Sequence, residues 1–232
     1  MTARKKFPVA LTIAGSDSGG GAGVQADLKT FAALGVHGAS AIACLTAQNP
    51  KRVLEVEPCS PKILRQQIEA VFEELPPRAV KTGMLFSVQN IAVVAGMFRE
   101  WNVGCVEAPT SGTARTGNAT EKRRAGGRRS ELTRSLSRPI PLVIDPVMIS
   151  TSGARLLQPA AEKVLKEKLL PLATLVTPNL DEAAILAGAK VSTPEAMRNA
   201  ARQIHARYGC AVLLKGGHLK NCREAMDIFF DG

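Results

Sequence analysis

The stretch Ile13-Ala-Gly-Ser-Asp-Ser-Gly-Gly-Gly-Ala-Gly-Val-Gln-Ala-Asp-Leu-Lys-Thr-Phe31 decides the fold of this chain. It continues an apolar run at residues 9–14, which is typical of a buried strand. Within and after its glycines, Val24, Leu28 and Phe31 recur at helical spacing. A glycine-rich turn therefore joins a strand to a helix, and this arrangement brings free backbone N–H groups close to a ligand.

The polar residues of this turn favour a binding loop over a tight turn without a ligand. Asp17, Gln25 and Asp27 stand beside or just after the glycines, which have no side chains to cover them. A glycine cluster alone would leave the two interpretations balanced. We therefore expect these three polar side chains to be uncovered and available to a ligand.

The rest of the chain alternates short apolar segments with amphipathic ones. The predicted strands span residues 8–14, 39–46, 79–83, 141–145, 173–177, 211–215 and 226–230. Beyond the glycine turn, the predicted helices span residues 61–75, 88–101, 159–170 and 194–208. Such alternation predicts an α/β fold with a mostly parallel central sheet and helices on both faces, in which ligands gather at the carboxyl ends of the strands.

Composition excludes several classes of protein. The chain has 232 residues, of which 45% are apolar and 22% charged, as in an ordinary globular domain. No apolar run approaches 18 residues, and residues 1–8 leave no room for a signal peptide. The five cysteines and three histidines are scattered, which indicates neither a disulfide framework nor a zinc site. We expect a cytoplasmic protein without membrane contact, with an organelle as the open alternative.

One segment interrupts the pattern and carries much of the charge. The formal net charge is +10, and residues 104–138 hold eight basic and three acidic residues, a balance of +5. This segment is rich in Gly, Ser, Thr and Arg and has few large apolar residues. No aromatic residue interleaves its arginines to stack on bases, so nucleic-acid binding is disfavoured. We expect a disordered insertion at about 104–139 within one domain that spans 1–232.

Six motifs, in order along the chain, resemble those of the hydroxymethylpyrimidine and hydroxymethylpyrimidine-phosphate kinases of thiamine biosynthesis, in the ribokinase superfamily. The glycine-rich turn is the first of them. The others are Thr46-Ala-Gln-Asn49, Lys81-Thr-Gly-Met84, Ile144-Asp-Pro-Val-Met148, Thr177-Pro-Asn-Leu-Asp-Glu182 and Leu214-Lys-Gly-Gly-His218. The resemblance covers about residues 7–103 and 140–231 and implies a ribokinase-like three-layer sandwich. It also implies transfer of a phosphoryl group from ATP to 4-amino-5-hydroxymethyl-2-methylpyrimidine or its monophosphate.

The resemblance implies a pyrimidine pocket. Gln48 follows a predicted strand, and its amide offers both a donor and an acceptor to the ring edge. Asp27 is expected to anchor the substrate hydroxyl or the loop. The positions that match other pocket residues of the family are Gly15, Ala22, Met84 and Val147.

The later motifs imply sites for ATP phosphates and Mg²⁺. Asn179, Lys215, Gly216 and Gly217 are expected at the phosphates. Asp145 and Glu182 are expected at the metal, since an aspartate that ends a buried strand needs a partner or a cation. The spacing of Asn179 and Glu182 equally predicts a helix N-cap with a capping box, and both interpretations can hold together.

The family's glycine–threonine–glycine turn, which supplies the anion hole and a candidate catalytic base, does not occur between Met1 and Gly232. On this ground we expect a C-terminally incomplete fold with impaired turnover, and no catalytic residue is assigned. Two alternatives stay open, namely a pyridoxal kinase-like enzyme and a non-catalytic pyrimidine-binding protein. A homodimer is also open, because related kinases often dimerise.

Overall fold

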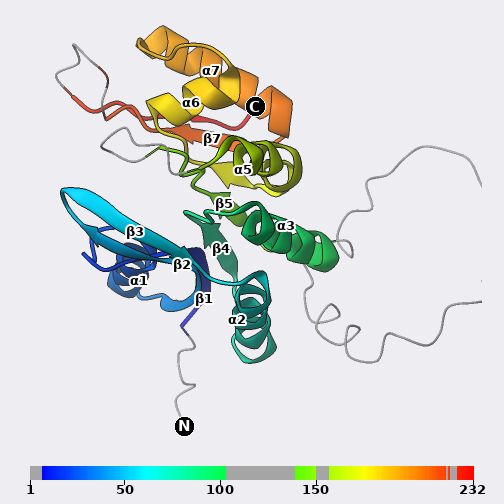
Figure 1. The fold of residues 1–232 in the computed structure, drawn as a ribbon. Coiled ribbons are helices and arrows are strands. Elements are labelled where there is room, and N and C mark those ends of the chain that lie inside the picture. The colour runs from blue at the N-terminus through cyan, green and yellow to red at the C-terminus, as the bar shows by residue number, and fades with distance from the viewer. Residues whose placement is uncertain (1–6, 103–138, 150–156, 218, 220–223) are drawn as a thin grey trace, which may run out of the picture.

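The computed structural model describes residues 7–102, 139–149, 157–217, 219 and 224–232 (Figure 1). In this part of the chain, one eight-stranded sheet has the order β3-β2-β1-β4-β5-β6-β7-β8. The strands are β1 (Val9–Asp17), β2 (His37–Asn49), β3 (Arg52–Pro58), β4 (Ala79–Thr82), β5 (Leu142–Ile144), β6 (Leu175–Val176), β7 (Ala211–Leu214) and β8 (Ile228–Phe230). In this order, every neighbouring pair from β2 through β1, β4, β5 and β6 to β7 is parallel. The edge strands β3 and β8 are antiparallel to their neighbours. The predicted insertion at about 104–139 lies, except for Pro139, outside the described residues.

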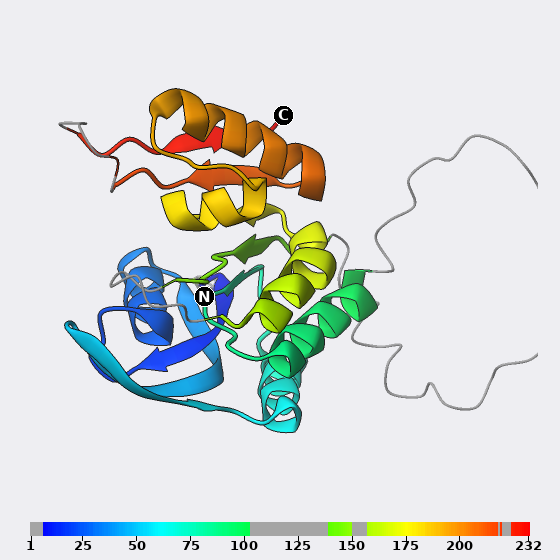
Figure 2. The same cartoon turned by 45° about the horizontal axis from the view of Figure 1, so that its top comes forward.

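Helices cover the sheet from both sides. They are α1 (Gly23–Ala33), α2 (Pro61–Glu74), α3 (Val88–Asn102), α5 (Pro159–Val164), α6 (Leu180–Ala187) and α7 (Pro194–Tyr208). Figures 1 and 2 show α2, α3 and α5 in a row on one side of the sheet and α1 on the other. Helix α6 packs on α7, which covers β7 and β8. The predicted α/β class with a mostly parallel sheet is confirmed.

The helix boundaries follow local signals that the sequence displays. Ser60 caps α2 by accepting a hydrogen bond from the backbone N–H of Ile63 at 3.3 Å, and Pro61 occupies the first turn. Thr193 caps α7 in the same way. Gly209 ends α7 in the left-handed conformation, with φ of 72°. These boundaries confirm the predicted helices at 61–75 and 194–208.

The structure differs from the sequence-based prediction in one strand and in the type of one helix. The sequence pattern does not predict strand β3. Its residues are mostly exposed at the sheet edge, so the strand has no buried apolar face. The predicted helix at 159–170 is α-helical only to Val164 and continues as a π-helical turn, Leu165–Leu169, and a 3₁₀ turn, Leu170–Leu172. Pro171 has no N–H to donate to the carbonyl of Glu167, so the last turn cannot be α-helical.

The buried centre of the sheet positions the polar residues at one edge. Leu11 and Ile13 in β1 and Leu142 and Ile144 in β5 are all fully buried. Because β1, β4, β5, β6 and β7 run in parallel, the residues that follow their carboxyl ends lie along the same edge.

Among the described residues, no helix has the length and apolarity needed to cross a bilayer.

Candidate functional site

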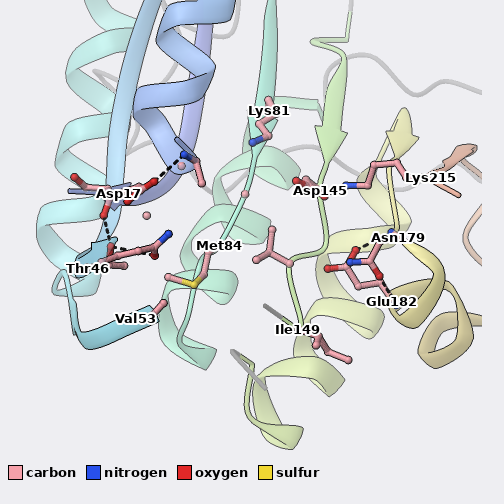
Figure 3. A pocket seen from close by; sticks show the side chains of 17 residues that line it. Asp17, Thr46, Val53, Lys81, Met84, Asp145, Ile149, Asn179, Glu182 and Lys215 are labelled. Atoms are coloured by element: carbon pink, nitrogen blue, oxygen red, sulfur yellow. Dashed lines mark hydrogen bonds and ion pairs between the residues drawn. The ribbon is translucent and has the colours of Figure 1, made fainter. Parts of the chain in front are cut away.

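A cavity of about 300 Å³ opens at the carboxyl edge of the sheet (Figure 3). It extends from the glycine-rich turn after β1 to the start of α6 and the end of β7. The lining residues are Gly15, Ser16, Asp17, Ala22, Gly23, Thr46, Gln48, Val53, Lys81, Gly83, Met84, Asp145, Val147, Ile149, Asn179, Glu182 and Lys215. The structure therefore brings together predicted pyrimidine residues and predicted phosphate residues that are far apart in the sequence.

Asp17 shapes the glycine-rich turn and is not uncovered as we expected. Its carboxylate accepts hydrogen bonds from the backbone N–H groups of Gly19, Gly21 and Ala22 at 2.7, 3.0 and 2.8 Å. Only 6% of the residue is exposed. Gln25 in turn accepts from the backbone N–H of Asp17 at 2.8 Å. Both side chains therefore fix the loop, since the turn's own N–H groups satisfy the Asp17 carboxylate.

Two glycines allow the loop to approach β1. Gly23 has φ of 57°, and a Cβ at this position would overlap the carbonyl oxygen of Gly15. A Cβ at Gly15 would lie 2.9 Å from the Cys44 sulfur and 3.2 Å from the terminal methyl of Met84. Glycine is needed at both positions, because neither leaves room for a side chain.

The first half of the cavity presents a neutral amide on a fixed backbone. The backbone N–H of Gln48 donates to the Ser18 hydroxyl at 2.8 Å, and that hydroxyl donates to the Gln48 carbonyl at 2.7 Å. Among the described residues, the side-chain amide has one weak contact, with its oxygen 3.4 Å from the Thr46 hydroxyl. The amide is therefore available to pair with a ligand, while its main chain is held in place.

Asp27 lies beside this half of the cavity but is not among its lining residues. Both of its carboxylate oxygens accept from the Lys81 ammonium, at 3.0 and 2.9 Å, and the Thr12 hydroxyl donates to one of them at 2.6 Å. Sequence reasoning left Lys81 without a role. The available signal was a lysine within a predicted buried strand, which requires an acidic partner.

The capping box predicted at the start of α6 is present. The Asn179 side chain accepts from the backbone N–H of Glu182, and Glu182 accepts from the backbone N–H of Asn179, both at 2.9 Å. The other Glu182 oxygen accepts from the Met148 backbone N–H at 3.1 Å. Only 2% of Glu182 is exposed; this burial raises the pKa of its carboxyl, and the nearby Asp145 carboxylate adds to the rise.

Asp145 and Lys215 form an ion pair at the second half of the cavity. The ammonium donates to Asp145 at 3.0 Å, and the Thr177 hydroxyl lies 3.4 Å from the same oxygen. Gly216 and Gly217 follow Lys215 but do not line the cavity. The backbone N–H of Gly216 donates to Asp227 at 3.0 Å, so its role in the structure is to hold the segment before β8.

Further lining residues were missing from the sequence-based assignment. Val53 belongs to the unexpected strand β3, and Ile149 follows the predicted Asp-Pro-Val-Met motif. Ser16 and Thr46 were quoted only as parts of motifs. Only the folded sheet shows that these positions face the same cavity.

The carboxylates suit a hard cation. Asp145 and Glu182 offer oxygen ligands at the same end of the cavity as Lys215 (Figure 3). Within the described part of the chain, no group of three or more His, Cys, Asp and Glu residues is arranged to hold a metal. Mg²⁺ commonly binds through one or two carboxylates together with water and substrate phosphates. The donor set therefore fits Mg²⁺ carried by a nucleotide better than an all-protein metal site.

A family model described as phosphomethylpyrimidine kinase matches residues 17–133 and 128–232. A hydroxymethylpyrimidine/phosphomethylpyrimidine kinase of Rhizobium meliloti is 45% identical over 225 residues, which cover 97% of this chain and 70% of the relative. A crystal structure of phosphomethylpyrimidine kinase from Clostridium difficile aligns with a TM-score of 0.75 and 41% identity, over 96% of this chain and 80% of the other. An ADP complex of Bacillus subtilis pyridoxal kinase aligns with a TM-score of 0.73 and 33% identity, over 98% and 72%.

Proposed function

The chain belongs to the phosphomethylpyrimidine kinase family, and on this premise we propose that its cavity binds an aminopyrimidine at the Gln48 end and Mg²⁺-ATP at the Lys215 end. The reaction would transfer the γ-phosphoryl group to the hydroxymethyl oxygen of the pyrimidine or to its monophosphate. One observation supports this most directly. A single cavity joins the weakly bonded amide of Gln48 at one end to a cation, two carboxylates and a helix N-terminus at the other.

The Gln48 end suits a flat, polar ring. An amide donates and accepts side by side, as does the edge of an aminopyrimidine. Met84 and Val147 supply apolar surface, and Gly15 leaves space because it has no side chain. The proposal therefore gives the amide the role of recognising the ring edge.

The Lys215 end suits phosphates. The ammonium and the backbone N–H groups at the start of α6 attract negative charge. Asp145 and Glu182 would hold Mg²⁺, and neutralisation of the phosphate charge is the chemistry that this ion supplies in such sites. In phosphoryl transfer the protein mainly positions two substrates and stabilises charge, so these residues match what the reaction requires.

Binding measurements test the proposal. Isothermal titration calorimetry of the chain with hydroxymethylpyrimidine and with a non-hydrolysable Mg²⁺-ATP analogue should show one site for each, occupied together. Pyridoxal provides the comparison, because a pyridoxal kinase shares the fold. Preference for pyridoxal, or failure to bind the nucleotide, would contradict the proposal.

The proposal also includes a cytoplasmic location and a homodimer. Size-exclusion chromatography with light scattering tests whether the chain forms a dimer.

Replacing Gln48 with alanine should weaken pyrimidine binding and leave stability nearly unchanged. In the described part of the chain this side chain has one weak hydrogen-bond contact, so its loss removes little from the fold. In the complex, the ring edge would be left without a partner, which costs about 1–3 kcal/mol, or about 5- to 150-fold in affinity. Calorimetry of Gln48→Ala beside Gln66→Ala, an exposed glutamine on α2, measures the difference. A loss of thermal stability with unchanged affinity would indicate a structural glutamine.

Replacing Lys215 with methionine should weaken nucleotide binding more than pyrimidine binding. The variant removes the cation beside Asp145 and leaves that carboxylate without its ion-pair partner. Loss of one hydrogen bond to a charged group corresponds to about 10- to 150-fold in affinity. Lys190→Met removes the same charge from an exposed position beyond α6 and is the matched control. Equal nucleotide affinities of the two variants would remove Lys215 from the phosphate site.

A further inference from the structure

One cation of the cavity has no role in the proposed transfer. Lys81 and Lys215 are the two cations among the described lining residues. Lys215 lies with Asp145, Glu182 and the start of α6 at the nucleotide end. Lys81 lies on β4 at the centre of the sheet, between the glycine-rich turn and Asp145 (Figure 3).

The Lys81 ammonium is held in place from one side. Both oxygens of Asp27 accept from it, at 3.0 and 2.9 Å, and the Thr12 hydroxyl fixes Asp27 at 2.6 Å. Thr12 is fully buried, and the side chains of Lys81 and Asp27 are 24% and 18% exposed. An ammonium carries three N–H donors, and among the described residues Asp27 is its one hydrogen-bond partner. Donor capacity therefore remains after the ion pair has formed.

A glycine leaves the ammonium open toward the cavity. Gly83 lines the cavity, and a Cβ at this position would lie 3.3 Å from the Lys81 nitrogen. Because residue 83 has no side chain, the Lys81 ammonium is not covered at this part of the cavity wall. An ion pair that served only the fold would need neither a place in the cavity lining nor this opening.

We propose that Lys81 selects the phosphorylated acceptor, by donating to the phosphate of an aminopyrimidine monophosphate. Asp27 and Thr12 act as positioning residues that hold the ammonium. This inference rests on the proposed function, whose two acceptors have the same ring and differ by a phosphate. The neutral amide of Gln48 reads the ring and cannot tell the two apart. Lys81 is the one cation on the acceptor half of the described cavity, so it supplies the charge that distinguishes them.

The test compares dissociation constants for hydroxymethylpyrimidine and its monophosphate by calorimetry. Lys81→Met should lower the preference for the monophosphate over the alcohol by about 10-fold or more, which corresponds to one hydrogen bond to a charged group. Asp27→Asn keeps a side-chain oxygen that can hold the ammonium but removes a like charge from the phosphate's surroundings, so it should shift the preference in the opposite direction, by about two- to fivefold. A purely structural pair would not produce opposite shifts. Lys62→Met, at an exposed position on α2, is the charge-matched control.

A second variant keeps the test decisive if Lys81→Met fails to fold. The double variant Lys81→Met/Asp27→Asn leaves no partly buried charge without its partner, and it should lose the monophosphate preference as well. The unmodified chain must bind both acceptors for this comparison. If it does, and the ratio of the two dissociation constants is unchanged in Lys81→Met or in the double variant, whichever folds, the assignment of Lys81 is overturned and the proposed function stands. Binding of neither acceptor by the unmodified chain would overturn the proposed function and this inference together.

Discussion

Replacing Gly23 with alanine is expected to destabilise the folded chain by about 2–5 kcal/mol, since a left-handed backbone costs an L-residue about 1–2 kcal/mol and overpacking about 1–3 more. Gly23 begins α1 with φ of 57°. An added Cβ would overlap the carbonyl oxygen of Gly15, which belongs to the central strand β1. A backbone atom in the middle of a sheet cannot move aside as a flexible side chain can. Chemical denaturation followed by circular dichroism measures the loss.

Gly188 provides a matched control for this substitution. It ends α6 with φ of 74°, and a Cβ there would meet nothing within 4 Å. Gly188→Ala should therefore show the backbone cost alone, about 1–2 kcal/mol. Equal losses from the two variants would mean that the contact between the glycine-rich turn and β1 contributes nothing to stability. A Gly23→Ala chain that retained full stability would contradict the close approach of the glycine-rich turn to β1.

Replacing Glu182 with alanine is expected to cost about 2–4 kcal/mol of stability. The buried carboxylate accepts from the backbone N–H groups of Asn179 and Met148. Each buried N–H left without a partner costs about 1–3 kcal/mol, and the capping box of α6 is lost as well. The variant therefore loosens the link between the start of α6 and the segment after β5. Thermal and chemical denaturation both measure this change.

The neighbouring Asp181 separates this effect from simple loss of charge. It also lies in the first turn of α6 but is exposed. Asp181→Ala should cost less than about 1 kcal/mol, because only the interaction with the helix dipole is lost. If the two variants were equally stable, the hydrogen bonds of Glu182 would have no part in holding the site together.

The stability cost of Glu182→Ala should also depend on pH. Burial raises the pKa of Glu182, so the folded state favours the protonated carboxyl. The contribution of Glu182 to the free energy of unfolding is complete below the pKa that its carboxyl has in the unfolded chain. This contribution decreases as the pH rises through the higher pKa of the folded state. The cost of the substitution should therefore be larger in acid than at neutral pH. An opposite trend would mean that the hydrogen bonds to the carboxylate outweigh its desolvation.

The sequence by itself determined the alternation of strands and helices, the helix caps and the order of the motifs. Ser60, Thr193 and Gly209 act within a few residues of their own positions, so their signals are local and legible. The same holds for the capping box of Asn179 and Glu182. The resemblance to a kinase family depended on motifs of this local kind, and the family match confirms it.

Only the tertiary structure decided which polar groups are available. In the sequence, Asp17, Asp27 and Gln48 look alike, since each is a polar residue in or just beyond a motif that follows a predicted strand. The fold satisfies Asp17 with N–H groups of its own turn and Asp27, on α1, with Lys81 from β4. Among the described residues, the Gln48 amide keeps only a 3.4 Å contact with Thr46. Availability depends on long-range pairing and desolvation, and these arise when β1, β2 and β4 come together in the sheet and α1 packs on it.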